Sequence, residues 1–221
     1  MGSITRGLSN NITTGGVVLP AGITNSSVSA VTSFANASGG TLILLSTQTA
    51  SASANISFTT GLDSTYDEYI FKFINIHPAT DGSRLAFNLS TDGGSNYNVT
   101  KTSTFFYAYH NEADGDTALG YLPTGDLAQS TSDQRITSAG GNSADADHAI
   151  VATLTLFNPS STTYVKHFIG VSQYTDTGDY STNDYVAGYA NTTSAINAIR
   201  FKMESGNIDD GIIKMYGVKK S

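Results

Sequence analysis

Most of the chain consists of short apolar or alternating runs of residues, separated by turn residues. In one such run, Tyr69, Phe71 and Phe73 would share one face of a β-strand and leave more polar residues on the other. The same period of two recurs at residues 153–156 and 199–203. Strands with one apolar and one polar face are typical of antiparallel sheets that pack face to face.

We predict an all-β fold, in which a jelly-roll-like antiparallel β-sandwich spans residues 41–221. Turn sequences such as Asp81-Gly82 and Asn158-Pro159-Ser160 lie between the runs, because Gly, Asn and Asp tolerate positive φ and Pro fixes φ. In residues 111–141 the period is weak, and we expect loops or short edge strands there. The predicted strands are 41–46, 54–60, 68–76, 84–90, 97–109, 134–138, 148–157, 164–174, 185–190, 196–204 and 211–218.

Residues 1–40 differ from the rest of the chain and predict an extended N-terminal arm. The first 62 residues carry a single formal charge, on Arg6, and have no sustained period of 2 or 3.6. The simplest alternative is a solvated terminus, but this segment is more apolar than a typical disordered tail. We therefore expect the arm to dock on another protein of a larger assembly. The docking residues that we predict are Ile4, Leu8, Ile12, Val17, Val18, Leu19, Ile23 and Val28.

The composition argues against several classes of partner. Charged residues make up 13% of the chain, against roughly 25% in soluble domains. The formal net charge of -7 disfavours nucleic acid, which needs clustered Lys and Arg. No apolar run approaches the length of a membrane-spanning helix, so we expect no membrane association. The absence of Cys excludes disulfides and thiolate metal sites.

The sequence offers no recognisable catalytic constellation. It contains neither a Cys nucleophile nor a Gly-x-Ser-x-Gly elbow, and its acids lie mainly in turns. We expect His77, His110, His148 and His167 to be ordinary sheet or turn residues. The prediction is a protein that is not an enzyme, with no catalytic residues, cofactor or metal.

A candidate ligand loop nevertheless lies near the middle of the chain. Tyr side chains can stack on sugar rings or fill a protein interface, because the ring is apolar and the hydroxyl polar. The neighbouring segment 111–116 is rich in oxygen ligands and suits calcium in principle, although a solvated acidic turn explains it more simply. The residues of the candidate loop are Tyr107, Tyr109, Asp114, Asp116 and Tyr121.

Four segments of the sequence resemble structural proteins of marine tailed bacteriophages, and the similarity covers nearly the whole chain. They are residues 4–13 (ITRGLSNNIT), 63–78 (DSTYDEYIFKFINIHP), 90–97 (STDGGSNY) and 211–218 (GIIKMYGV). The resemblance implies a virion component and identifies no catalytic residues.

From this resemblance and the arm we expect a capsid decoration or cement protein on the virion surface. It would be a homotrimer, docked through residues 1–40 on other virion proteins, such as the major capsid or tail proteins. One alternative is a short tail fibre or other tail appendage that binds a host glycan. A third interpretation, a polysaccharide depolymerase, would require paired carboxylates in a groove.

Overall fold

The computed structural model describes residues 12–13, 16–17, 41–138 and 140–219. The chain divides into two units, Met1–Gly39 and Gly40–Ser221, and each is described by itself. In the first unit, β1 (Ile12–Thr13) and β2 (Gly16–Val17) form an antiparallel pair with Ile12 opposite Val17. The other predicted docking residues, Ile4, Leu8, Val18, Leu19, Ile23 and Val28, lie outside the described residues. The docking arm therefore stays a prediction.

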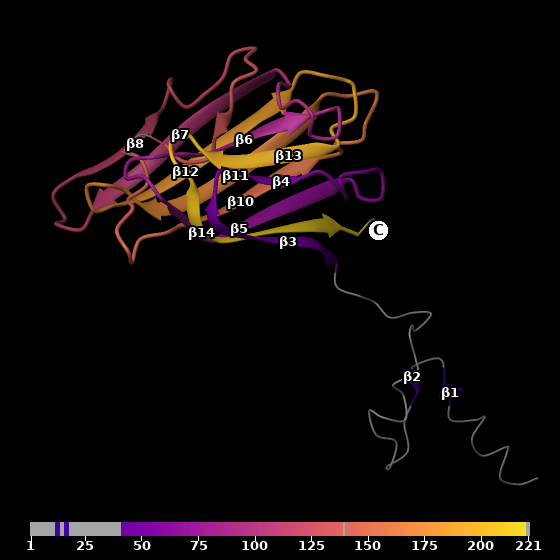
Figure 1. Cartoon of the computed structure of the whole chain (residues 1–221), viewed down its shortest axis with the longest axis horizontal. Helices are drawn as coiled ribbons and strands as arrows, with labels where there is room; N and C mark the ends of the chain where they lie inside the picture. Colours follow the sequence, from indigo (N-terminus) through magenta and orange to yellow (C-terminus); the bar gives the residue numbers. More distant parts are fainter. Residues whose placement is uncertain (1–11, 14–15, 18–40, 139, 220–221) are drawn as a thin grey trace, which may run out of the picture. The chain divides into compact units, whose positions relative to one another are not determined.

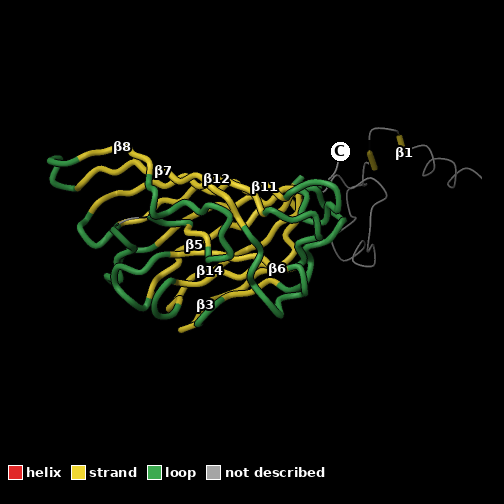
Figure 2. The backbone as a smooth tube through the Cα atoms, turned by 90° about the horizontal axis from the view of Figure 1, so that it is seen from above, coloured by secondary structure: helices red, strands yellow, loops and turns green. Residues whose placement is uncertain are grey.

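The second unit is a sandwich of two antiparallel sheets (Figures 1 and 2), which confirms the predicted fold class. The larger sheet has eight strands in the order β3 (Leu42–Ser53), β14 (Ile208–Val218), β5 (Glu68–Pro78), β10 (Ile150–Phe157), β11 (Lys166–Thr175), β12 (Tyr180–Ala190), β7 (Lys101–Asn111) and β8 (Thr117–Tyr121). The smaller sheet has four, in the order β4 (Ile56–Phe58), β13 (Ala198–Met203), β6 (Leu85–Ser90) and β9 (Gln134–Arg135). No helix occurs in the described part of the chain, so it contains none that could cross a membrane.

Each predicted strand corresponds to a strand of the structure, although several boundaries differ. β3 continues to Ser53 because it pairs with β14 over nearly its whole length. β12 begins at Tyr180, five residues before its predicted start, because its first residues pair with both β11 and β7. The predicted strand 97–109 was placed too early, since β7 begins at Lys101. The weakly periodic region contains the short edge strand β8.

The two sheets enclose an aromatic and aliphatic core on what we call the inner face of the larger sheet. Tyr69, Phe71 and Phe73 of β5 are buried there, as their spacing predicts, while Lys72 lies on the opposite, outer face. The smaller sheet contributes Phe201 of β13 to the same core. Burial of each such side chain stabilises the fold by about 1.5–3 kcal/mol.

Eight strands form a wider sheet than four can cover, and the chain closes part of the gap with the segment between β8 and β10. The amide of Ser103 donates to the carbonyl of Leu127 at 2.9 Å, and the amide of Lys101 donates to the carbonyl of Ser130 at 2.8 Å. These bonds hold the segment along β7. Near the end of β7 the cover is incomplete, because Tyr107 and Tyr109 are only half-buried whereas Phe105 is fully buried.

Candidate functional site

A pocket of about 150 Å³ opens on the inner face of the larger sheet, where β7 ends and β12 begins. Its walls come from both strands, from the β7–β8 and β11–β12 turns, and from the segment that follows β9. The lining residues are Tyr107, Tyr109, Asp116, Ser138, Gly140, Asp176, Tyr180 and Thr182. The structure thus brings together three residues of the predicted ligand loop, Tyr107, Tyr109 and Asp116.

Three tyrosine rings form a corner of this pocket. Tyr107 and Tyr109 point to the same side of β7, and their rings lie parallel, at an interplanar angle of 1° and a centroid distance of 5.8 Å. The ring of Tyr180 meets that of Tyr109 edge to face, at 88° and 5.1 Å. Tyr180 reaches this position because it begins β12, beside the end of β7, where it lies opposite Asn111. The corner therefore presents rings in two perpendicular orientations.

Two carboxylates stand beside the rings. Asp116 accepts a hydrogen bond from the Tyr180 hydroxyl at 3.2 Å, which with the nearby negative charge raises the pKa of Tyr180. Asp176 Oδ1 accepts the amides of Gly178 at 2.8 Å and Tyr180 at 3.1 Å, so this side chain also shapes the β11–β12 turn. Burial and then the charge of Asp116 raise the pKa of Tyr109, with a smaller contribution from Asp176. The negative potential of both acids thus reaches the rings.

A third carboxyl group is buried near the pocket. Asp184 of β12 is fully buried and lies opposite Tyr107 in the strand register. Burial raises its pKa to about 7, although the Ser138 and Tyr174 hydroxyls favour the ionised form. The hydroxyl of Tyr174 lies 3.1 Å from both the amide nitrogen and the hydroxyl of Ser138. Ser138, which lines the pocket, is therefore hydrogen-bonded to the buried hydroxyl of Tyr174.

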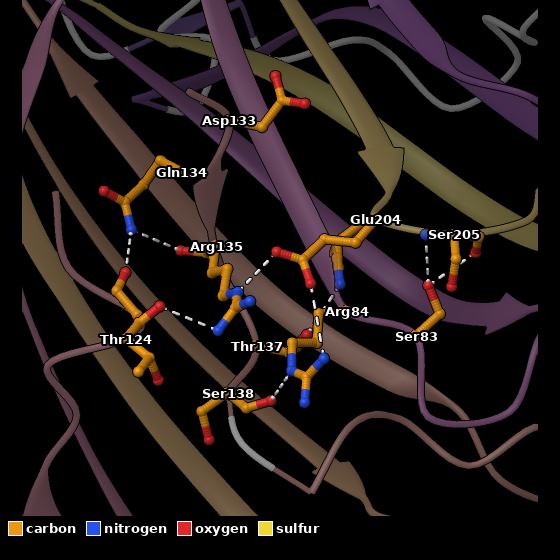
Figure 3. Close-up of polar contacts among 12 residues, drawn as sticks. Ser83, Arg84, Thr124, Asp133, Gln134, Arg135, Thr137, Ser138, Glu204 and Ser205 are labelled. Atoms are coloured by element: carbon orange, nitrogen blue, oxygen red, sulfur yellow. Dashed lines mark hydrogen bonds and ion pairs between the residues drawn. The ribbon is translucent and has the colours of Figure 1, made fainter. Parts of the chain in front are cut away.

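The wall that contains Ser138 is held by charged side chains around Glu204 (Figure 3). Arg135 Nε lies 2.6 Å from Glu204 Oε1, and Arg84 Nη1 lies 3.6 Å from Glu204 Oε2. Arg84 Nε also donates to the carbonyl of Ser138 at 2.9 Å, and Arg135 donates to the carbonyl of Thr124 at 3.0 Å. The segment from β9 to the pocket is thereby fixed to the end of β13.

The remaining residues of the predicted ligand loop lie away from the pocket. Asp114 is 3.0 Å from His110 Nε2, and its side chain is 92% exposed. Tyr121 donates a hydrogen bond to Asp126 and lies on the outer face of the sheet. Asn111 Oδ1 accepts the amides of Gly115 at 2.8 Å and Asp116 at 3.0 Å. The oxygen-rich loop is thus closed by its own hydrogen bonds, as in an ordinary turn.

A second polar cluster, at the same end of the sheet, was not predicted. One ligand atom from each of Asp145, His148 and Asp179 lies within 4.8 Å of the others. Asp145 and His148 share one turn, but Asp179 comes from the β11–β12 turn, so local sequence gives no sign of the grouping. Beside it is an open hollow of about 470 Å³, lined in part by His77, His148 and Asp209. All the members of the cluster are at least partly exposed.

The outer face of the larger sheet carries many exposed large apolar side chains. Phe106 of β7 and Tyr185 of β12 stack on it at an interplanar angle of 8° and a centroid distance of 4.9 Å. Shallow hollows of about 400 and 460 Å³ lie between neighbouring strands of this face. Its exposed large apolar side chains are Leu42, Leu44, Ile74, Phe106, Leu119, Tyr121, Val151, Ile169, Val171 and Tyr185.

Comparison with known proteins adds no identification. No protein-family model, no curated protein and no solved structure matches the chain. The interpretation of the pocket and of the outer face therefore depends on their own geometry.

Proposed function

We propose that this chain is a non-enzymatic structural protein of a tailed bacteriophage particle, and that it works by assembly as a capsid decoration or cement protein on the virion surface. The observation that carries the proposal is the apolar outer face of the eight-stranded sheet. Soluble monomers seldom expose large contiguous apolar surfaces, and such surfaces commonly mark sites of protein association. The resemblance of four sequence segments to phage structural proteins supports the virion as the place of assembly.

The few charges of the outer face indicate which chemical groups a partner protein would present to it. Lys72 of β5 lies directly opposite Lys214 of β14, and neither forms an ion pair with another described residue. Like charges in this arrangement destabilise a sheet. A partner surface that offers apolar side chains around a carboxylate would relieve the repulsion and cover the face. We propose another virion protein, the major capsid protein in the first instance, as that partner.

Residues 1–40 would supply a second attachment. Their low charge and their apolar residues suit contact with protein better than solvation. In this proposal the arm docks on the particle, and a homotrimer of sandwiches is held close to the shell.

A tail fibre or tail appendage that binds a host glycan is the second candidate function. The tyrosine-lined pocket favours it, because aromatic rings beside hydroxyls and carboxylates can hold a sugar ring. The depolymerase interpretation gains less support. A pocket of about 150 Å³ is smaller than the roughly 300–1,000 Å³ of most sites for larger organic ligands, so it would not enclose an oligosaccharide.

The decisive experiment is to localise the chain and to alter its outer face. We expect it in purified particles and in heads that lack tails, whereas a tail appendage would be absent from such heads. The double variant Ile169→Glu, Val171→Glu places two acids on exposed positions of β11 and should fold normally but fail to join particles. The double variant Thr193→Glu, Ser194→Glu adds the same charge to exposed positions of the β12–β13 loop; it is the matched control and should assemble.

Two results would contradict the proposal. Particles that lack the chain altogether would remove the virion role. Release of sugar from host polysaccharide by the purified protein would show an enzyme.

A further inference from the structure

The pocket between β7 and β12 combines aromatic rings with acidic side chains. It has three tyrosine rings, two carboxylates in its wall, and no Lys, Arg or His among the described residues that line it. We propose that this pocket binds an organic ammonium ion, such as a choline-like head group or an alkylated amine.

The rings supply the first part of the recognition. The face of a tyrosine ring carries partial negative charge and attracts a cation held within about 6 Å of its centre. Because Tyr180 stands at 88° to Tyr109, and Tyr109 is parallel to Tyr107, the corner holds ring faces in two orientations. A cation is attracted by the faces of these rings and not by their edges, which are partly positive. Aromatic cages bind alkylated ammonium groups through such ring faces.

The carboxylates supply the second part. Asp116 and Asp176 both line the pocket, and Asp184 lies buried beside it, opposite Tyr107. None of the three forms an ion pair with a basic side chain of the described residues. Gly140 is part of the arrangement, because a Cβ at this position would overlap the carboxylate of Asp176. The pocket therefore concentrates the negative charge of Asp116 and Asp176, which no basic side chain of the described residues pairs with.

The size and donor set of the pocket distinguish an ammonium ion from other ligands. A volume of about 150 Å³ takes a group of roughly benzene size, which matches a trimethylammonium head. A neutral sugar would gain nothing from the charge of the two carboxylates, whereas a cation is attracted by it. A divalent metal ion prefers converging oxygen ligands, and here ring faces occupy much of the wall. The combination of rings and acids fits an organic cation best.

This inference does not depend on the proposed assembly function, since the pocket lies on the inner face and the proposed assembly surface on the outer face. The ammonium group could belong to a small molecule or to an alkylated lysine of a protein. The chemistry of recognition is the same, and the probes below separate quaternary from primary amines.

The test is a titration of the full chain, followed by the NMR signals of the tyrosine rings and by calorimetry. Choline chloride is the main probe, and butylammonium chloride represents a primary amine such as the side chain of unmodified lysine. Dimethylbutanol, in which carbon replaces the quaternary nitrogen of choline, is the uncharged control of equal shape. We expect choline to bind in the millimolar range and dimethylbutanol to bind at least about tenfold more weakly.

Matched variants then locate the site. Asp116→Asn removes one charge from the pocket but keeps an oxygen to accept from the Tyr180 hydroxyl, and should weaken choline binding by about fivefold or more. Tyr109→Leu removes the central ring and should do the same. Asp114→Asn removes an equal charge from the same loop at a position outside the pocket, and should change binding by less than about twofold.

Three outcomes would overturn the inference. The first is equal binding of choline and dimethylbutanol, or no binding of either ammonium probe. The second is equal weakening by Asp114→Asn and Asp116→Asn, which would indicate a general charge effect. The third is tighter binding of glucose or calcium chloride than of choline at the same ring signals, which would assign the pocket to a sugar or a metal ion.

Discussion

The rings of Phe71 and Phe201 meet edge to face between the two sheets, with their centroids 5.2 Å apart and their planes inclined by 61°. Phe71 belongs to β5 of the larger sheet and Phe201 to β13 of the smaller one, and both are fully buried. Phe58 of β4 packs edge to face on each of them. This cluster joins the layers where no disulfide is available.

Replacing either ring should therefore weaken the whole sandwich. We expect Phe71→Ala and Phe201→Ala each to lower the free energy of unfolding by about 3–5 kcal/mol, the loss for a buried Phe and the cavity that it leaves. Because the rings touch, a double-mutant cycle measured by urea denaturation should show a coupling of about 0.5–1.5 kcal/mol. Phe106→Ala, on the exposed outer face, is the control. A loss below about 1 kcal/mol at Phe71 would contradict its place in the core.

The buried carboxyl of Asp184 should make stability depend on pH. Burial raises its pKa from 3.8 to about 7, so the folded chain binds the proton more tightly than the unfolded chain. The free energy of unfolding should then fall as the pH rises from about 4 to about 7, by up to about 4 kcal/mol. Asp184→Asn keeps the shape but cannot ionise, and should flatten this dependence relative to the unaltered protein. An identical pH profile for both proteins, measured by thermal unfolding, would refute the assignment.

A buried lysine should give the opposite dependence in a more alkaline range. Lys101 is fully buried, and its Nζ donates to Asn88 Oδ1 at 2.6 Å and to the Val99 carbonyl at 2.8 Å. Desolvation lowers its pKa from 10.5 to about 8, although the charge of Asp133 opposes this. At pH values between about 8 and 10.5 the unfolded chain therefore binds more protons than the folded chain. The free energy of unfolding should rise with pH across this range, by about 3 kcal/mol over the full difference between the two pKa values.

Lys101→Met should abolish this rise, and the slope against pH is the informative quantity. The absolute stability of the variant also includes the two acceptors that lose their donor, Asn88 and Val99. The comparison should stop below pH 10, because burial raises the pKa of Tyr174, whose ionisation in the unfolded chain then favours unfolding. A variant that keeps the same slope would show that Lys101 is not the titrating group.

The sequence predicts the strands and their buried faces well, because the relevant signal is local. The structure buries Tyr69, Phe71 and Phe73, and it leaves the residues between them, which are smaller or polar, at least partly exposed. Lys101 shows where local reasoning ends. It shares the inner face with Ser103 and Phe105, so a charge occupies a position that the alternation reserves for an apolar residue. That burial is made tolerable by hydrogen bonds to Asn88, on a different strand, and to the nearby Val99 carbonyl, together with the charge of Asp133.

The pocket was predictable in part for the same reason. Tyr107, Tyr109 and Asp116 are close in sequence and belong to the predicted ligand loop. Tyr180 and Asp176 join them through the register of β7 and β12, which pairs Tyr180 with Asn111. No local pattern encodes that register. The ring corner, the buried Asp184 and the cluster around His148 all depend on pairings between distant strands.

Deletion of residues 1–40 tests whether assembly needs the N-terminal arm as well as the outer face. Among the described residues, the hydrophobic core lies between Ala50 and Met215, so the shortened chain should fold, with a thermal unfolding midpoint close to that of the full chain. It should nevertheless fail to join particles, because the low charge and apolar residues of the arm suit it to docking. A shorter deletion that keeps Ile12 and Val17 would show whether the β1–β2 pair contributes. Normal incorporation of the chain that lacks residues 1–40 would leave the outer face as the sole attachment and would refute the docking role of the arm.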